Sequence, residues 1–284
     1  MAADVLLNIK NLNIVFKSPK GDFHAVKNMC LSMGKEKIGI VGESGSGKTA
    51  SARAILKLLP ASAKISADAI EFNGQDILNK SEKEMRGIRG KGITMVMQDP
   101  RYSLNPVRTV GRQITESFLA HRNVSGKEAV RRTLEMLEAV RIRKPERVFG
   151  LYPHEVSGGM GQRIMMAMML IPEPALLIAD EPTSSLDVTV QLQVLAILDD
   201  LVTRRGMGLI FISHDLELVS SFCDRVIIMY AGRVMEVCEA KALRQSSHPY
   251  TRGLLNCLPR ITGNEDLLPT LKREDAWLKA SFSY

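Results

Sequence analysis

The sequence predicts an α/β protein with a parallel sheet, an antiparallel β layer at its start and a helical insertion in its middle. Three observations support this prediction. Apolar residues alternate at period two near the N-terminus, short apolar runs alternate with helical segments further on, and a central block from about Asn105 to Met169 contains no convincing strand. The 284 residues correspond to about one or two domains.

The N-terminal layer rests on two alternating segments. Apolar residues alternate with mostly polar ones over Asn11–Phe16 and again over Asn28–Met33. Period-two alternation is typical of strands with one buried face. The turn-rich segment Ser18–Asp22 separates the two segments, so we expect two half-buried strands joined by a turn.

The parallel sheet is predicted from compact apolar runs. Ile38–Val41 is followed by a loop of glycines and serines and by a helical stretch from Lys48 to Leu59, which Pro60 closes. Continuous short apolar runs are typical of strands that are buried on both faces. The further runs expected to form such strands are Ile93–Met97, Ala175–Ala179, Leu209–Ile212 and Val226–Met229.

The central block shows only helical signals. Ser125 and Glu128 have the spacing of a capping box at a helix start. The methionines within Met165–Met169 are expected to be adaptable core residues of a second helix. The expected buried face of the first helix carries Val130, Leu134, Leu137 and Val140.

Composition and charge exclude several classes of protein. Apolar residues make up 45% and charged residues 24%, as in a soluble globular protein. The longest stretch without a charged residue, Val188–Leu198, is far shorter than the roughly 20 residues of a membrane-spanning helix. The N-terminus lacks the pattern of a signal peptide, and the four cysteines show no CxxC spacing. A reduced, cytoplasmic protein is therefore expected, and the net charge of +7 is spread along the chain rather than gathered for nucleic acid.

The loop after Ile38–Val41 matches the pattern G-x-x-x-x-G-K-[ST], between a buried strand and a helix. Its glycines let backbone N–H groups turn toward phosphates, and the helix N-terminus favours the same anion. Lys48 supplies a charge for the β- and γ-phosphates, and the Thr49 hydroxyl is a ligand for Mg²⁺. The sequence thus predicts ATP binding by Gly42, Glu43, Ser44, Gly45, Ser46, Gly47, Lys48 and Thr49.

Two carboxylates end another apolar run. Asp180 and Glu181 follow Leu176–Ala179, at the carboxyl end of a predicted parallel strand, where ligands bind in open α/β sheets. Adjacent residues of a strand point to opposite sides, so we expect different roles for the two side chains. Asp180 is assigned to Mg²⁺, and Glu181 to the water that attacks the γ-phosphate.

Further motifs, in this order along the chain, resemble those of the ATP-binding-cassette (ABC) ATPases. Gln98 resembles the glutamine-loop residue of that family, and Ser157–Arg163 resembles its signature sequence. Ser184–Asp187 resembles its dimer-contacting loop, and His214 its switch histidine. The resemblance covers nearly the whole chain and implies a P-loop NTPase (RecA-like) core.

The resemblance also implies roles for these residues. Ser157, Gly158 and Gly159 would hold the γ-phosphate of a nucleotide on the opposite subunit, so that two cassettes form a head-to-tail dimer. Gln98 would reach Mg²⁺ or the attacking water, and His214 would donate a hydrogen bond to the γ-phosphate. An aromatic residue upstream would stack on adenine, and Phe16 and Phe23 both remain candidates.

A narrower resemblance points to the oligopeptide, dipeptide and nickel importer ATPases. Gln98–Pro106 is similar to their extended glutamine loop, and His248–Leu255, preceded by Tyr230–Arg233, to their C-terminal motif. Gly161 departs from the family, whose members usually carry Arg there, and this change could alter packing. Some peptide-importer ATPases bear a C-terminal cysteine cluster, but only Cys257 lies beyond the motif, so we expect no iron–sulfur centre.

The resemblance implies an ATPase that powers uptake of di- or oligopeptides or of nickel-type solutes. Its implied partners are a second ATPase subunit (the same or a related chain), two transmembrane permease subunits and an extracytoplasmic solute-binding protein, with no nucleic acid. The implied location is the cytoplasmic face of the inner membrane, peripherally bound. The alternatives are a soluble ABC ATPase that acts on nucleic acid or the ribosome, and a non-enzymatic regulator, which Lys48, Asp180, Glu181 and His214 disfavour. We expect the cassette to occupy residues 1–260, with its helical subdomain at about 102–170, and a tail of unassigned role to occupy 261–284.

Overall fold

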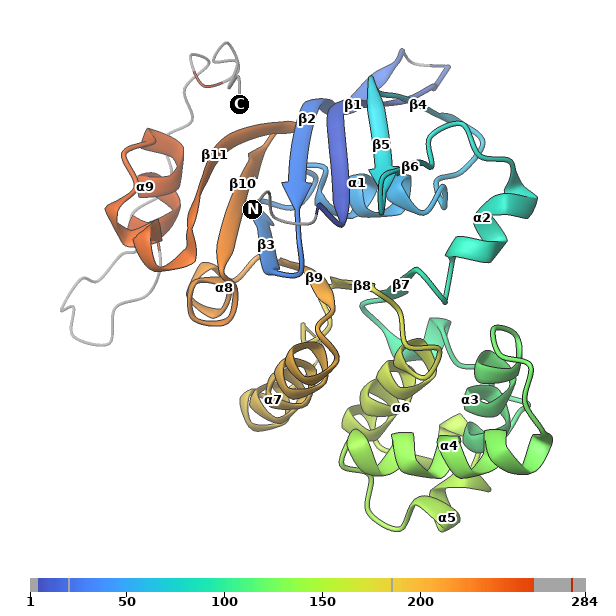
Figure 1. Cartoon of the computed structure of the whole chain (residues 1–284). Helices are drawn as coiled ribbons and strands as arrows, with labels where there is room; N and C mark the ends of the chain where they lie inside the picture. Colours follow the sequence, from blue (N-terminus) through green and yellow to red (C-terminus); the bar gives the residue numbers. More distant parts are fainter. Residues whose placement is uncertain (1–4, 20, 185, 258–276, 278–284) are drawn as a thin grey trace, which may run out of the picture. The chain divides into compact units, whose positions relative to one another are not determined.

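The computed structural model describes residues 5–19, 21–184, 186–257 and 277. The chain divides into two compact units, one of Met1–Asn79 with Phe211–Tyr284 and one of Lys80–Ile210. In Figure 1, the first unit holds most of the strands and the second holds the green helices α3, α4 and α5 together with α6.

The N-terminal layer is an antiparallel sheet, as the alternation predicts. β1 (Leu7–Phe16) pairs with β2 (Phe23–Met33), with Leu7 opposite Met33 at one end. Leu12 and Ile14 are completely buried, so one face of β1 belongs to the core. The sheet is completed by β4 (Ala63–Ser66), β5 (Ala69–Phe72) and β6 (Gln75–Asp76).

The first unit also contains the predicted parallel pairing. β3 (Lys37–Gly42) pairs in parallel with β10 (Arg225–Tyr230), and β10 pairs antiparallel with β11 (Arg233–Glu239). Ile38, Ile40 and Val41 have no exposed surface, as expected for a strand within the core. The helices of this unit are α1 (Lys48–Ile55), α8 (Leu216–Phe222), the 3-10 helix η3 (Ala240–Gln245) and α9 (Pro249–Asn256).

The helix α1 ends earlier than the predicted Leu59. Lys57 adopts a left-handed conformation (φ +51°), and the Leu58 amide donates a 2.9 Å hydrogen bond to the Arg53 carbonyl oxygen. These are the features of a Schellman motif, which closes a helix by satisfying its last carbonyls. The helix therefore stops at Ile55 on local backbone bonding, several residues before Pro60.

In the second unit, β7 (Ile93–Val96) pairs in parallel with β8 (Leu176–Asp180), and every residue of both strands is buried. The fully buried β9 (Gly208–Ser213) begins in this unit and ends in the other. The predicted strand runs are thus confirmed, with ends that differ by at most one residue. The helices before α6 are α2 (Glu82–Ile88), η1 (Pro100–Tyr102), α3 (Val110–Leu119), α4 (Gly126–Ala139), α5 (Pro145–Phe149) and η2 (Pro153–Glu155).

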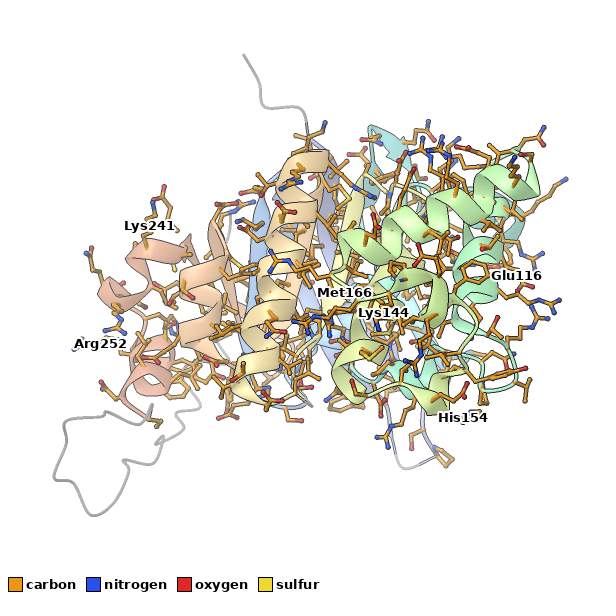
Figure 2. All side chains as sticks on the ribbon, turned by 90° about the horizontal axis from the view of Figure 1, so that it is seen from below. Glu116, Lys144, His154, Met166, Lys241 and Arg252 are labelled. Carbon is orange, nitrogen blue, oxygen red and sulfur yellow. The ribbon has the colours of Figure 1, made fainter. Side chains whose placement is uncertain are left out.

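The central block is helical as predicted: within Asn105–Met169 the described residues form helices and no strand. Its last helix, α6 (Gly158–Leu170), carries the methionine group, of which Met165 and Met166 are buried. Figure 2 labels Met166 among the helices of this unit. The prediction that these methionines are core residues is therefore confirmed for the two buried ones.

The buried face of α4 differs from the prediction. Val130 is 38% exposed, so it does not belong to that face. Thr133 is completely buried instead, and its hydroxyl lies 2.9 Å from that of Thr115 on α3. Small and hydroxyl-bearing residues let two helices approach closely, which a count of large apolar residues does not reveal. The buried residues of α4 are Ala129, Thr133, Met136 and Leu137.

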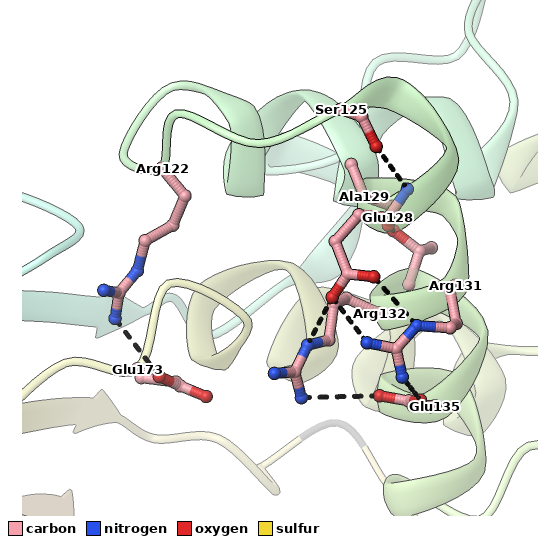
Figure 3. Close-up of polar contacts among 9 residues, drawn as sticks. Arg122, Ser125, Glu128, Ala129, Arg131, Arg132, Glu135 and Glu173 are labelled. Atoms are coloured by element: carbon pink, nitrogen blue, oxygen red, sulfur yellow. Dashed lines mark hydrogen bonds and ion pairs between the residues drawn. The ribbon is translucent and has the colours of Figure 1, made fainter.

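The predicted capping box at the start of α4 forms only in part (Figure 3). Ser125 Oγ accepts a 3.2 Å hydrogen bond from the Glu128 amide, but the Glu128 carboxylate pairs with Arg131 and Arg132 instead. The hydrogen bond from Arg131 lowers the pKa of Glu128. Glu135 pairs with the same two arginines, so alternating charges one turn apart line this exposed surface.

Among the described helices, α7 (Val188–Arg205) is the longest. It begins at Asp187, whose carboxylate accepts a hydrogen bond from the Val190 amide, and ends at Gly206 in a left-handed conformation. Among the described residues, no helix combines the length and the apolar character needed to span a bilayer.

Candidate nucleotide-binding and hydrolysis site

The phosphate loop has the context that its sequence predicts. It connects the buried end of β3 to the first residue of α1, and Gly47 is the helix N-cap with φ +103°. A Cβ atom on Gly47 would lie 2.5 Å from the Ala25 carbonyl oxygen, and one on Gly42 would lie 2.1 Å from the Met229 carbonyl oxygen. Both contacts are with backbone, so only glycine fits at these two positions.

The polar groups of the loop are held inward. Lys48 is only 6% exposed, and its Nζ donates hydrogen bonds to the carbonyl oxygens of Gly42 (2.8 Å) and Glu43 (2.9 Å). Ser46 is also buried, and its Oγ has no hydrogen-bond partner among the described residues. Thr49 follows in the first turn of α1. A buried ammonium group beside a helix N-terminus is suited to binding phosphate.

Asp180 and Glu181 differ in burial and backbone conformation, and the cause is not the predicted alternation of side chains along a strand. Asp180 is the last residue of β8 and is 5% exposed. Glu181 lies beyond the strand, half-buried, and has a left-handed conformation (φ +47°) although Pro182 follows it. Residues other than glycine seldom have positive φ, and such strain is concentrated at functional sites. The turn at Glu181, not the pleat of a strand, separates the two carboxylates.

Gln98 lies beside Glu181. Gln98 Nε2 donates hydrogen bonds to Glu181 Oε2 (3.4 Å) and to Ser184 Oγ (3.1 Å). Ser184 Oγ in turn donates to the Glu181 carbonyl oxygen (3.2 Å). Three polar side chains from three predicted motifs thus form one group. Ser184 was not among the predicted site residues, because its motif suggested only a contact between subunits.

The residues after Gln98 are fixed by a local ion pair. Asp99 accepts a 2.9 Å hydrogen bond from the Arg101 amide at the start of η1, and its carboxylate pairs with the Arg101 guanidinium at 2.7 Å. The hydrogen bond from the Arg101 side chain lowers the pKa of Asp99. This pair is exposed, so its effect is to shape the loop rather than to stabilise the protein substantially.

The signature segment begins α6. Ser157 is the N-cap, and its Oγ accepts a 3.4 Å hydrogen bond from the Met160 amide. A Cβ atom on Gly159 would lie 2.7 Å from the Val190 side chain, so this glycine permits close packing of α6 against α7. Gly158 is exposed, with no atom near the position of a Cβ. Ser157, Gly158 and Gly159 thus lie at the N-terminus of α6, and their binding of a phosphate stays a prediction.

Gln162 is a second residue that was not among the predicted site residues. It is completely buried, and its Nε2 donates a 2.6 Å hydrogen bond to the Pro182 carbonyl oxygen. Its position was visible in the pattern: Met165 and Met166 lie three and four residues later and are buried on the same helix. A polar amide at a position that the helical spacing assigns to the buried face was therefore the signal of a specific role for Gln162.

His214 is exposed and follows β9 directly. Ser213 Oγ accepts a 3.0 Å hydrogen bond from the Asp215 amide, and Asp215 caps α8 by accepting a 2.9 Å bond from the Leu218 amide. His214 therefore stands between two residues with fixed backbone positions. Such a setting holds its imidazole on the surface of the first unit.

Phe16 and Phe23 are cross-strand partners at the end of the β1–β2 pair. Phe16 is half-buried and Phe23 is 59% exposed. Partners directly opposite each other lie on the same face of a sheet. The two candidates for adenine stacking are thus neighbours, and the choice between them stays open.

The predicted site residues are distributed over both units. The first unit carries the phosphate loop, the two aromatic candidates and His214. The second carries Gln98, the two carboxylates and the signature segment. Within the second unit, the structure brings Gln98 and Glu181 into contact.

A scan against family models matches residues 26–184 to the ABC transporter family. The chain belongs to the ABC transporter family. The match includes the phosphate loop, Gln98, the signature segment and both carboxylates, so the resemblance inferred from the motifs is confirmed.

The relatives of this ABC chain include transport proteins of bacteria. It is 45% identical over 271 residues to the oligopeptide transport ATP-binding protein OppD of Escherichia coli (strain K12), which covers 95% of this chain and 80% of that protein. It is 43% identical over 269 residues to the dipeptide transport ATP-binding protein DppD of Haemophilus influenzae, which covers 94% and 82% of the two proteins.

Solved structures of ABC cassettes share its fold. One is the dimeric post-hydrolysis state of the ATP-binding cassette MJ0796 bound to ADP and Pi, with a TM-score of 0.74 and 26% identity over 83% of this chain and 99% of that one. Another is cbiO1 from Clostridium perfringens, part of the ABC transporter complex cbiONQ. Its TM-score is 0.73, and it is 26% identical over 89% of this chain and 95% of that one. The predicted fold class and the assignment as an ABC ATPase, which binds ATP, are confirmed.

Two features of narrower importance also have structural explanations in this ABC ATPase. The C-terminal motif forms α9, where His248 is the N-cap and Tyr250 and Thr251 are completely buried. Thr251 Oγ1 donates a 2.6 Å hydrogen bond to Glu236 on β11, so the motif is a packing element.

Gly161, where the family usually carries Arg, is not forced to be a glycine by its neighbours. A Cβ atom there would lie 3.6 Å from Pro100, which is an ordinary contact.

Proposed function

We propose that the chain is the ATP-hydrolysing subunit of an ABC importer for dipeptides or oligopeptides. Two observations support this proposal: the complete set of motifs for ATP hydrolysis, and identity of 43–45% over most of the chain to oligopeptide and dipeptide transport proteins. Nickel-type solutes are a second possible cargo of the same subfamily. The relatives named above are transport proteins, and they give no support to the alternative of a nucleic-acid or ribosome-linked ATPase.

The proposed cofactors are ATP and Mg²⁺. The buried Ser46 hydroxyl, which has no partner among the described residues, and the buried Lys48 ammonium both fit a phosphate group. The remaining residues of Gly42–Thr49 would contribute backbone N–H groups. Hydroxyl, carboxylate and amide oxygens are the ligands that Mg²⁺ prefers, so Thr49, Asp180 and Gln98 would hold the ion, which neutralises charge on the phosphates.

The proposed hydrolysis assigns one role to each polar group. Glu181 accepts a proton from water as the water oxygen bonds to the γ-phosphorus, and the bond from that phosphorus to the bridging oxygen of ADP breaks. Gln98, in contact with Glu181, orients the same water. His214 donates a hydrogen bond to the γ-phosphate. Ser157, Gly158 and Gly159 bind the γ-phosphate held by the second cassette of a dimer.

The proposed partners follow from this role. They are a second ATPase subunit, identical or related, two transmembrane permease subunits and an extracytoplasmic solute-binding protein. The chain would lie peripherally at the cytoplasmic face of the inner membrane. We further propose that residues 1–260 form the cassette, with a helical subdomain at about 102–170. Residues 261–284 would form a C-terminal tail of unassigned role, and all of them except 277 lie outside the described residues. The proposal retains the expectation of no iron–sulfur centre.

A transport assay tests the proposal. The chain is reconstituted with its permease subunits in vesicles that enclose ATP and Mg²⁺, and labelled peptides are added outside with the solute-binding protein. We expect accumulation that requires ATP and is lost with Lys48→Ala. Accumulation of nickel chelates but not of peptides would refute the proposed cargo. ATP hydrolysis stimulated by RNA or DNA, with no peptide uptake, would favour the alternative function.

A further inference from the structure

A buried hydrogen bond connects the signature helix to the segment that carries Glu181. Gln162 lies on α6, five residues after Ser157, and is completely buried. Its Nε2 donates a 2.6 Å hydrogen bond to the carbonyl oxygen of Pro182, the residue after Glu181. The side chain thus acts on the backbone beside the carboxylate and does not contact the carboxylate itself.

Packing alone does not explain an amide at this position. A carbonyl oxygen only accepts hydrogen bonds, so the amide must present Nε2 and not Oε1 to Pro182. In that orientation Gln162 Oε1 is buried, and it has no hydrogen-bond partner among the described residues. A methionine would fill a similar volume without leaving a buried oxygen unsatisfied. The bond to Pro182 is the one feature of this position that requires the amide.

The segment that receives the bond is strained. Glu181 has φ +47°, and Pro182, which follows it, has no N–H with which to form a hydrogen bond. Ser184 secures the Glu181 carbonyl oxygen through its hydroxyl (3.2 Å). Gln162 secures the next carbonyl oxygen along the chain. The Ser184 amide donates a further 3.3 Å hydrogen bond to the Glu181 carbonyl oxygen. Because strained conformations persist only when their surroundings over-determine them, we expect the bond from Gln162 to contribute to holding the turn at Glu181.

We propose that Gln162 is a positioning residue for ATP hydrolysis, which aims the Glu181 carboxylate by holding the Pro182 carbonyl. The inference rests on the proposed role of Glu181 as the base. Gln162 acts on the loop after β8 and not on the phosphate loop, so its loss should slow turnover without weakening ATP binding. A displacement of about 1 Å at a reacting group can reduce a rate about 100-fold.

Two substitutions at Gln162 test the proposal in steady-state ATP hydrolysis by the full chain. Gln162→Met removes the donor and keeps the side chain's length, so kcat should fall about 10- to 100-fold while KM for ATP changes less than about twofold. Gln162→Glu can donate to Pro182 only while its carboxyl is protonated, a form that burial favours. Its kcat relative to wild type should therefore decline as pH rises from about 6 to about 8.5.

The matched control is Thr133→Val on α4. Thr133 is also completely buried in the second unit, and its hydroxyl donates to the Ala129 carbonyl oxygen at 2.9 Å. This variant should lose stability and keep the wild-type kcat. If Gln162→Met does not fold, the pH dependence of kcat in Gln162→Glu tests the positioning role instead. That dependence is a reversible change within one folded protein, so a general loss of folding does not explain it.

The outcomes separate this inference from the proposed function. If Glu181→Gln abolishes turnover but Gln162→Met keeps the wild-type kcat, the positioning role of Gln162 is refuted and the role of Glu181 as base is retained. The same conclusion holds if the ratio of kcat in Gln162→Glu to kcat in wild type does not vary with pH. If Glu181→Gln keeps turnover, the proposed role of Glu181 itself is refuted. Equal losses in kcat and ATP affinity in Gln162→Met would also refute positioning, because they would indicate general damage.

Discussion

Two glycines of the phosphate loop allow a stability test without nucleotide. Gly45 and Gly47 both have positive φ, +79° and +103°. A Cβ atom on Gly45 would have no neighbour within 4 Å, whereas one on Gly47 would lie 2.5 Å from the Ala25 carbonyl oxygen and 3.1 Å from the Val26 side chain. Gly45→Ala therefore changes only the conformational preference of the residue, and Gly47→Ala adds a collision with strand β2.

The difference between the two variants can be worked out from these contacts. A left-handed conformation costs an alanine about 1–2 kcal/mol. Forcing an extra carbon into a packed site costs a further 1–3 kcal/mol or so, and the carbonyl oxygen of a paired strand cannot move aside easily. We therefore expect Gly45→Ala to lower the free energy of unfolding by about 1–2 kcal/mol, and Gly47→Ala by about 2–5 kcal/mol.

Equilibrium unfolding in urea, followed by circular dichroism without nucleotide, measures both values. Wild type, Gly45→Ala and Gly47→Ala are compared under the same conditions. If the two variants differ by less than about 0.5 kcal/mol, the collision with Ala25 is not what makes Gly47 necessary, and the steric reasoning is wrong.

The other predictions concern ligand binding and thiol chemistry. Lys48→Ala removes a charged hydrogen-bond donor to phosphate, worth about 1.5–3 kcal/mol, so the Kd for ATP should rise about 10- to 100-fold in calorimetric titration; an unchanged Kd would contradict the phosphate role. Burial raises the pKa of Cys223 to about 12 and of Cys238 to about 11. A thiol reagent at pH 8 should therefore modify Cys30 and Cys257 first, as peptide mass mapping would report, and rapid labelling of Cys223 would refute its burial.

Elements that depend on short-range pattern could be predicted from the sequence. The alternation in β1 and β2 and the buried strands β7 and β8 follow from which residues are apolar and how they are spaced. The phosphate loop was predictable for a steric reason. Neighbouring backbone atoms leave no room for a side chain at Gly42 or Gly47, so the glycines of the motif are required there.

Features that depend on tertiary packing could not be predicted. The predicted face of α4 was right for Leu137 and Val140, which are completely buried, and wrong for Val130, which is exposed. The small residues Ala129 and Thr133 pack inward instead. The end of α1 depends on the backbone conformation of Lys57, which no residue type at that position signals.

The local geometry at Glu181 also could not be predicted from the sequence. The argument from strand alternation assumed that β8 continues through Glu181, but the strand ends at Asp180 and the chain turns with positive φ. The contacts of Glu181 with Gln98 and of Pro182 with Gln162 join residues 83 and 20 positions apart. Only the folded second unit brings these groups together.

Steady-state ATP hydrolysis by Glu181→Gln tests the central claim most directly. Glutamine keeps the size of the side chain and removes the base, and general-base catalysis contributes about 10²- to 10⁴-fold. The account predicts a loss of kcat of that size, with the Kd for ATP within about twofold of wild type because the phosphate loop is intact. Hydrolysis by Glu181→Gln at the wild-type rate would contradict it.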